Sequence, residues 1–309
     1  MERVDSRTAI AVLAVVMGLL GSVPSYAVAA PLKVAATIFP LYDLVRQVAG
    51  GEAEVVLLVP PGASPHTVAF RPSMMRELAG SAALFAIGYG LDDWAVRLAA
   101  DAGVQQVVHS HGDEALPTEV QAEHHHHHDG PEGRHADAMT DPHYWLSIPN
   151  AMHMVGVIAA ALERLDPEGK QGYVKRAGER LRAMREADRD IRRQLADLPR
   201  REIALFHAAF AYFAAAYDLH IVATFEPEPG REPGPRHVRE FLRRLRDRQL
   251  RTLFIEPQLD ATPLRQLARD IGLTPALLDP LGGSAGREDY LTMMRFNASQ
   301  IAAALRESR

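Results

Sequence analysis

Three histidines, His66, His143 and His207, lie in local sequence contexts unlike those of the other histidines in the chain. The first follows a Pro-Gly turn, the second follows Asp-Pro, and the third ends an apolar run, so each falls at a junction between regular elements. A neutral imidazole binds transition metals or transfers protons. Each histidine taken singly is better explained as an ordinary polar residue than as a metal ligand, and spacing alone does not establish a site.

The elements around these histidines alternate between β-rich runs and helical patterns. This alternation predicts βαβ units with mostly parallel sheets. In open parallel sheets, ligands collect beyond the carboxyl ends of the strands, so junction residues from two sheets can converge in one cleft. Asp279, directly after a short strand at Ala276–Leu278, is the matching position late in the chain. A turn role before Pro280 explains it as well as metal coordination does.

The chain divides into an export segment, two α/β lobes and a helix that joins them. Residues 1–29 have a positive start, an apolar run and small residues at Ala27-Val28-Ala29, which predicts a removed signal peptide and a periplasmic protein. The other predicted parts are an N-terminal lobe over 30–166, a linking helix over 167–198 and a C-terminal lobe over 199–309. The helical pattern would reach roughly 45 Å. A strut between lobes and a charged helix packed along one domain explain it equally well.

Composition excludes several classes. The chain has 309 residues, no cysteine and a formal net charge of -5, so it can form neither a disulfide nor a thiolate metal site, and no lipidated cysteine can follow the signal. No basic stripe suited to nucleic acid is present. Of the 14 histidines, 8 fall within residues 109–140, a stretch without hydrophobic periodicity that predicts a mobile surface loop.

The local motifs, in order, resemble those of the zinc and manganese solute-binding proteins of ABC importers, most closely the zinc-specific, ZnuA-type members with the TroA-like fold. They cover nearly all of the mature chain. These motifs are Pro60 to His66 with Arg71 to Ser73, Asp141 to Leu146, His207 to Phe213, Glu256 to Gln258, and Leu278 to Gly282. The ZnuA-type members also carry a loop rich in histidine and acidic residues before the second ligand histidine.

The resemblance implies two Rossmann-like lobes joined by a long backbone helix, with the metal in the cleft between them. It implies that His66 and His143 bind from the first lobe and His207 from the second, with Asp279 where some relatives place a fourth ligand. Some zinc members have an acid before the first histidine, but here that residue is Pro65. The fourth ligand is therefore Asp279, water or a residue of the loop. Glu256 is interpreted as structural support.

Three histidines and at most one carboxylate favour zinc, because manganese prefers more oxygen ligands. We expect a monomer that binds Zn2+ and delivers it to an inner-membrane ABC permease. The histidine cluster should add weak metal sites that supply the cleft, or have incidental metal affinity only. That cluster comprises His124, His125, His126, His127 and His128.

Three other functions remain open. They are a manganese or iron importer component, a periplasmic zinc buffer that serves no permease, and a zinc hydrolase. The hydrolase would use three histidines and an open metal position. No convincing general base accompanies the histidines, and the chain has no HExxH motif.

Overall fold

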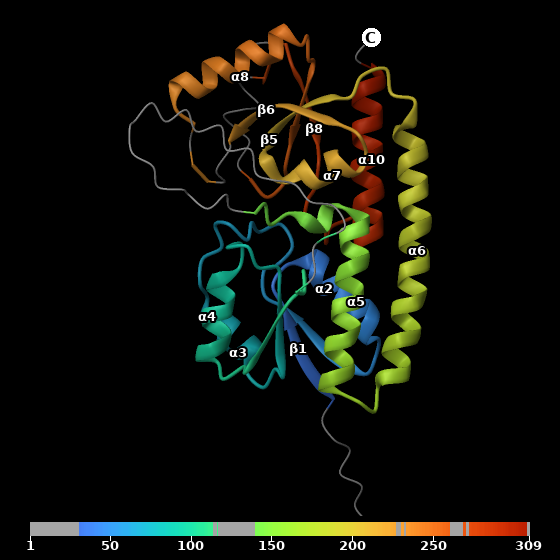
Figure 1. Ribbon diagram of the computed structural model, residues 1–309. Helices are drawn as coiled ribbons and strands as arrows, with labels where there is room; N and C mark the ends of the chain where they lie inside the picture. The colour runs from blue at the N-terminus through green and yellow to red at the C-terminus, as the bar shows by residue number, and fades with distance from the viewer. Residues whose placement is uncertain are drawn as a thin grey trace, which may run out of the picture. The chain divides into compact units, whose positions relative to one another are not determined.

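The computed structural model describes residues 31–113, 116, 140–226, 230–231, 233–259, 268–269 and 272–307 (Figure 1). The segment predicted to be a signal peptide and the cluster His124–His128 lie outside the described residues. Within the described part of the chain, no helix has the length and apolar character needed to span a membrane. The regular elements form two parallel sheets with flanking helices.

The first lobe is built on a four-stranded parallel sheet with the order β2-β1-β3-β4. Its strands are β1 (Leu32–Ala36), β2 (Ala53–Leu57), β3 (Ala83–Ala86) and β4 (Gln106–His109). Its crossover helices are α2 (Phe39–Ala49), α3 (Pro72–Leu78) and α4 (Asp93–Asp101). A 3-10 turn, η1 (Tyr144–Leu146), and helix α5 (Ile148–Leu165) follow. The apolar runs of β1 and β3 are buried, as expected of strands covered on both faces.

The second lobe repeats this plan with the strand order β6-β5-β7-β8, also parallel. Its strands are β5 (Glu202–His207), β6 (His220–Glu226), β7 (Thr252–Ile255) and β8 (Thr274–Leu277). Its other elements are η2 (Ala208–Phe210), α7 (Ala211–Ala216), α8 (Pro235–Asp247) and α10 (Tyr290–Glu307). In both lobes the order of strands reverses beside the first strand of the sheet, which is where ligand crevices form in open parallel sheets.

Local signals explain where the site-bearing helices begin. Pro40 and Pro149 lie in the first turns of α2 and α5, where a missing N–H leaves no hydrogen bond unmade. The hydroxyl of Ser147 accepts a hydrogen bond from the backbone N–H of Asn150 and so caps α5. These signals fix the start of α5 a few residues after His143.

The long helix α6 (Lys170–Ala196) has 27 residues, about 40 Å of helix. It packs against α2 and α5 of the first lobe and against α10 of the second, and Figure 1 shows it running beside α5 and α10. Its buried positions, among them Tyr173, Met184 and Ile191, belong to a hydrophobic core that also contains residues of both sheets. This packing supports the strut interpretation over a helix confined to one domain.

Buried polar contacts add to the connection between the lobes. Asp43 of α2, with no exposed surface, accepts a hydrogen bond from the backbone N–H of Tyr290, where α10 begins, and pairs with Arg180 of α6 at 3.3 Å. The indole N–H of Trp145 donates to the carbonyl oxygen of Pro280 at 2.7 Å. The hydroxyl of Tyr290 donates to the carbonyl oxygen of Trp145, also at 2.7 Å. The segment that carries His143 is therefore anchored to the second lobe.

The predicted fold class is confirmed: two parallel-sheet α/β lobes with a long helix. One strand of the described structure was missed. The predicted loop began at His109, whereas His109 is the last residue of β4 and pairs in register with Ala86. The strand is short, lies at the edge of the sheet and has an intermediate or exposed burial pattern, so its apolar signal was weak.

Candidate metal centre

Three connections carry the three histidines to one place. His66 follows β2 through a turn in which the backbone N–H of Ala63 donates to Pro60 and Gly62 has a φ of 84°. That φ favours glycine. His143 directly precedes η1, and His207 is the last residue of β5. The first sheet's loops thus supply two histidines and the second sheet's first strand supplies the third.

The ligand atoms of the three side chains all lie within 4.8 Å of one another. The Nε2 atoms of His66 and His143 are 3.2 Å apart. Two nitrogens bound to one tetrahedral zinc at 2.0–2.1 Å lie about 3.3 Å from each other. The pair therefore already has the separation that a shared zinc ion would require.

Asp141 fixes the ring of His143. One oxygen, Oδ1, accepts hydrogen bonds from the backbone N–H of His143 at 2.9 Å and from its Nδ1 at 2.6 Å. The proton is accordingly on Nδ1, and Nε2 keeps its lone pair for a metal. Carboxylate partners of this kind orient metal-binding imidazoles and raise their basicity.

His207 has an equivalent partner in Glu256, just after β7. Its Nδ1 lies 3.3 Å and 3.4 Å from the two carboxylate oxygens of Glu256, and both side chains are buried. Glu226 of β6, also buried, pairs in register with His207. Two carboxylates so close to an imidazole offset the charge of a cation bound at the same ring.

Burial and neighbouring charges separate the protonation behaviour of the histidines. Burial, together with His143 and His207 nearby, lowers the pKa of His66 to about 3. Burial also opposes protonation of His207, but the Glu256 carboxylate outweighs it, with Asp141 and Glu226 adding to the effect, so the pKa of His207 is raised above its ordinary value. The His66 ring is therefore neutral at every physiological pH, whereas the His207 ring takes up a proton more readily than an ordinary histidine.

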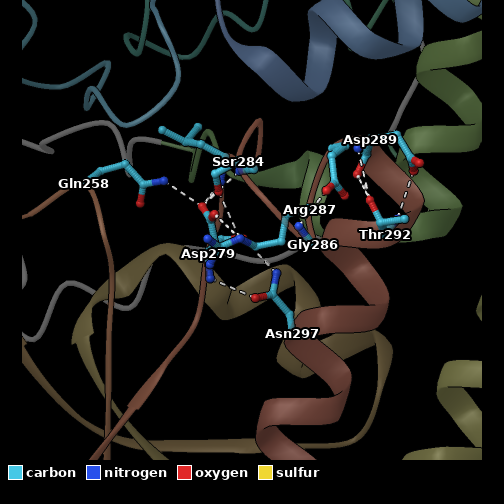
Figure 2. Close-up of polar contacts among 11 residues, drawn as sticks. Gln258, Asp279, Ser284, Gly286, Arg287, Asp289, Thr292 and Asn297 are labelled. Carbon is cyan, nitrogen blue, oxygen red and sulfur yellow. Dashed lines mark hydrogen bonds and ion pairs between the residues drawn. The ribbon is translucent and has the colours of Figure 1, made fainter.

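Asp279 does not belong to the group of converging ligand atoms found among the described residues. Its Oδ1 accepts hydrogen bonds from Gln258 and from the backbone N–H groups of Leu281 and Gly282 (Figure 2). Its Oδ2 faces Nε of Arg287 at 3.2 Å. The carboxylate thus closes the turn that follows β8, the structural role that sequence reasoning left open beside coordination.

The structure brings together His66, His143 and His207 as sequence reasoning expected. Sequence reasoning gave no role to Asp141 or Gln258. An acidic residue two positions before a candidate ligand was a usable signal, because its side chain can reach back to the ring. Gln258 carried no such signal, since only the folded chain places it in the pocket lined by the three histidines.

Two parallel-sheet lobes that together present a buried group of histidines define a metal solute-binding protein. The chain belongs to the family described as zinc-uptake complex component A, periplasmic (ZnuA), whose model matches residues 34–304. Members of this family are solute-binding proteins and not enzymes, so the hydrolase alternative is excluded.

Curated relatives include zinc and manganese proteins. The zinc-binding protein AdcA of Streptococcus pyogenes serotype M3 is 25% identical over 287 residues, covering 87% of this chain and 55% of AdcA. This chain therefore spans about half the length of that relative. The manganese-binding lipoprotein MntA of Halalkalibacterium halodurans is 27% identical over 281 residues, covering 89% of this chain and 88% of MntA.

Solved structures show the same fold. A crystal structure of ZnuA matches with a TM-score of 0.76 and 25% identity, covering 89% of this chain and all of that one. The solute-binding protein FpvC of Pseudomonas aeruginosa in complex with Mn2+ matches with a TM-score of 0.75 and 25% identity, covering 91% of this chain and all of FpvC. Because relatives of similar identity carry different metals, the choice of metal rests on the residues of the site.

Proposed function

We propose that this protein captures Zn2+ through His66, His143 and His207 and delivers it to an ABC permease in the inner membrane. The observation that carries the proposal is the 3.2 Å separation of two Nε2 atoms within a three-histidine group whose buried members each have a carboxylate at Nδ1. Carboxylates at Nδ1 orient such rings so that Nε2 faces a bound cation.

The donor set favours zinc over manganese. All three converging residues are histidines, and the nearby acids Asp141 and Glu256 are engaged with ring nitrogens. Manganese prefers carboxylate, carbonyl and water oxygens, whereas zinc binds well to three imidazoles with one further ligand. Manganese transport, which MntA among the relatives suggests, is the second candidate.

The remaining features of the proposal concern the whole protein. Residues 1–29 direct export and are removed, so that the mature chain acts in the periplasm as a monomer. The family's periplasmic description and the signal-like composition of the segment support this localisation. The lobes comprise residues 30–166 and 199–309, joined through residues 167–198, which agrees with where α6 lies.

Replacement of His207 tests the site. In His207→Gln the side chain can still hydrogen-bond Glu256 but no longer offers an imidazole, so zinc affinity should fall more than about 100-fold, beyond the loss typical of an outer partner. Calorimetric titration with a competing chelator measures it, beside a titration with Mn2+. The exposed His220, replaced as His220→Gln, is the matched control and should bind as the wild type does.

Three results would contradict parts of this proposal. Unchanged zinc affinity in His207→Gln would remove His207 from the site. Tighter binding of Mn2+ than of Zn2+ by the unaltered protein would favour the manganese alternative. Normal zinc-limited growth of a strain lacking the protein would argue for a buffer that feeds no permease.

A further inference from the structure

We propose that Gln258 holds a water molecule that completes the metal's coordination, and that Asp279 positions Gln258 and does not bind the metal. The inference rests on the proposed three-histidine site. Three imidazoles fill three of the four positions of a tetrahedral zinc ion, and the proposed water occupies the fourth.

Among the described residues, no carboxylate oxygen belongs to the group of converging ligand atoms, and this includes that of Glu226 on the neighbouring strand β6. Asp141 and Glu256 are held against Nδ1 of His143 and His207. Asp279 is fully buried: Oδ1 accepts three N–H donors, whereas Oδ2 accepts no hydrogen bond from the described residues and is paired by charge with Nε of Arg287 at 3.2 Å. The donors to Oδ1 hold the carboxylate in the turn after β8, and Oδ2 would have to give up its pairing with Arg287 to bind a metal. A small exogenous ligand is left for the fourth position.

Gln258 is oriented by its contact with Asp279. Its Nε2 donates to Oδ1 of Asp279 at 2.6 Å, and Figure 2 shows the amide nitrogen turned toward that carboxylate. A flipped amide would set its oxygen against the carboxylate oxygen, so the contact fixes which end of the amide is the acceptor. Asp279 in turn is held by Asn297, whose Oδ1 accepts from the Asp279 backbone N–H and whose Nδ2 donates to the Asp279 carbonyl oxygen.

The other end of the amide has no donor. The Oε1 atom of Gln258 is buried and accepts no hydrogen bond from the described residues. Gln258 lines the same pocket as His66, His143 and His207. Buried carbonyl oxygens without a donor are rare and need an explanation. Water bound to a divalent cation is a strong hydrogen-bond donor, which is the partner this oxygen lacks.

This arrangement has a consequence for selectivity. A neutral water at the fourth position keeps the site at three nitrogens and one oxygen, the tetrahedral set that suits zinc. A carboxylate from Asp279 would have added the hard, multidentate oxygen donor that manganese prefers. By binding Asp279 to Gln258 and Arg287, the fold withholds that carboxylate from the metal.

Cobalt substitution tests the inference, because Co2+ reports coordination through its visible spectrum. The full mature protein loaded with Co2+ should show the intense bands of a four-coordinate site, and pulsed EPR in 17O-enriched water should detect a directly bound oxygen. Thiocyanate should displace that water with a saturable spectral shift. In Gln258→Leu the four-coordinate spectrum should remain, while thiocyanate binds several-fold more tightly because the water has lost its acceptor.

The exposed Gln105, replaced as Gln105→Leu, is the matched control and should leave thiocyanate affinity unchanged. A purely structural role for Gln258 would also leave it unchanged, and this result would overturn the inference. So would an absence of 17O coupling in the unaltered, four-coordinate protein. Failure of the unaltered protein to give a four-coordinate Co2+ spectrum would instead contradict the proposed three-histidine site.

Discussion

At the scale of single residues, an acidic side chain at one ring nitrogen of a histidine determines which nitrogen remains available to a metal. Asp141 and Glu256 each face Nδ1 of a buried histidine, so Nε2 is the atom left to bind a metal. His66 has no such acid among the described residues, and burial together with its histidine neighbours keeps it neutral. An unprotonated nitrogen is therefore available at His66 for a different physical reason than at His143 and His207.

Replacing the acid behind His143 tests its role. In Asp141→Asn the side-chain oxygen can still accept the backbone N–H of His143, but the negative charge that faces Nδ1 of the ring is lost. Zinc affinity should fall about 10- to 100-fold. A chelator competition measures it, with the exposed Asp101, replaced as Asp101→Asn, as control. Equal affinities in the two variants would show that Asp141 does not tune the ligand.

The raised pKa of His207 predicts how zinc binding depends on pH. Only a neutral imidazole binds zinc, so affinity should begin to fall as pH drops through the raised pKa of His207, while His66, with a pKa of about 3, adds nothing in this range. In Glu256→Gln burial is no longer outweighed, so the onset should move to lower pH although affinity at pH 8 is weaker. Chelator competition from pH 5 to 8.5 measures both, and an onset that does not move would contradict the assignment to His207.

At the scale of elements, α6 is held to α2 and α10 by a buried carboxylate as well as by apolar packing. Asp43 pairs with Arg180, whose side chain is 12% exposed, and receives the first backbone N–H of α10. A charge paired inside the protein contributes little by itself, but removing one partner leaves the other uncompensated. A single substitution of Asp43 should consequently lower the free energy of unfolding measurably.

Asp43→Ala should lower the free energy of unfolding by about 3 kcal/mol, because Arg180 and the N–H of Tyr290 would lose their buried acceptor. Urea denaturation of the metal-free protein measures it. Asp190, which pairs with Arg193 and Arg295 and is 44% exposed, provides the control. Asp190→Ala should cost less than about 1 kcal/mol. A similar loss in both variants would mean that the Asp43 network is no more than a surface contact.

At the scale of the whole molecule, the metal would connect the two lobes, because the three histidines come from both. A ligand that binds only the folded chain stabilises it, by about 4 kcal/mol at a thousand times the dissociation constant. A helix of 27 residues packed on both lobes limits how far they can separate. Capture of zinc should therefore change the protein more in stability than in shape.

The histidine cluster His124–His128 should add zinc sites weaker than the one formed by His66, His143 and His207. The mature protein should bind one zinc tightly in the three-histidine site and further zinc weakly on the histidine cluster, since low-complexity composition without hydrophobic periodicity provides no packed core to hold ligands in place. Deleting residues 117–138 leaves β4 and the three converging histidines intact. Calorimetry should then show a single tight class with the wild-type affinity. Loss of the tight class on deletion would place the tight site in the deleted segment and contradict its assignment to the three converging histidines.

The amino-acid sequence alone was sufficient for the broad organisation. Alternating apolar runs and helical patterns predicted two parallel-sheet lobes and a long helix, because hydrophobic periodicity is a local property of the chain. The ordered motifs around His66, His143 and His207 identified the residues that converge. The edge strand ending at His109 was missed, since a short, partly exposed strand has little periodicity to read.

Only the tertiary structure decided which polar groups face each other. Sequence reasoning could not choose between a turn role and a ligand role for Asp279, because both suit an aspartate before proline. The folded chain brings Gln258, 21 residues earlier, against that carboxylate and sets Arg287 opposite it. Hydrogen-bond partners depend on distances of a few tenths of an ångström between segments far apart in the chain, and no local pattern encodes those distances.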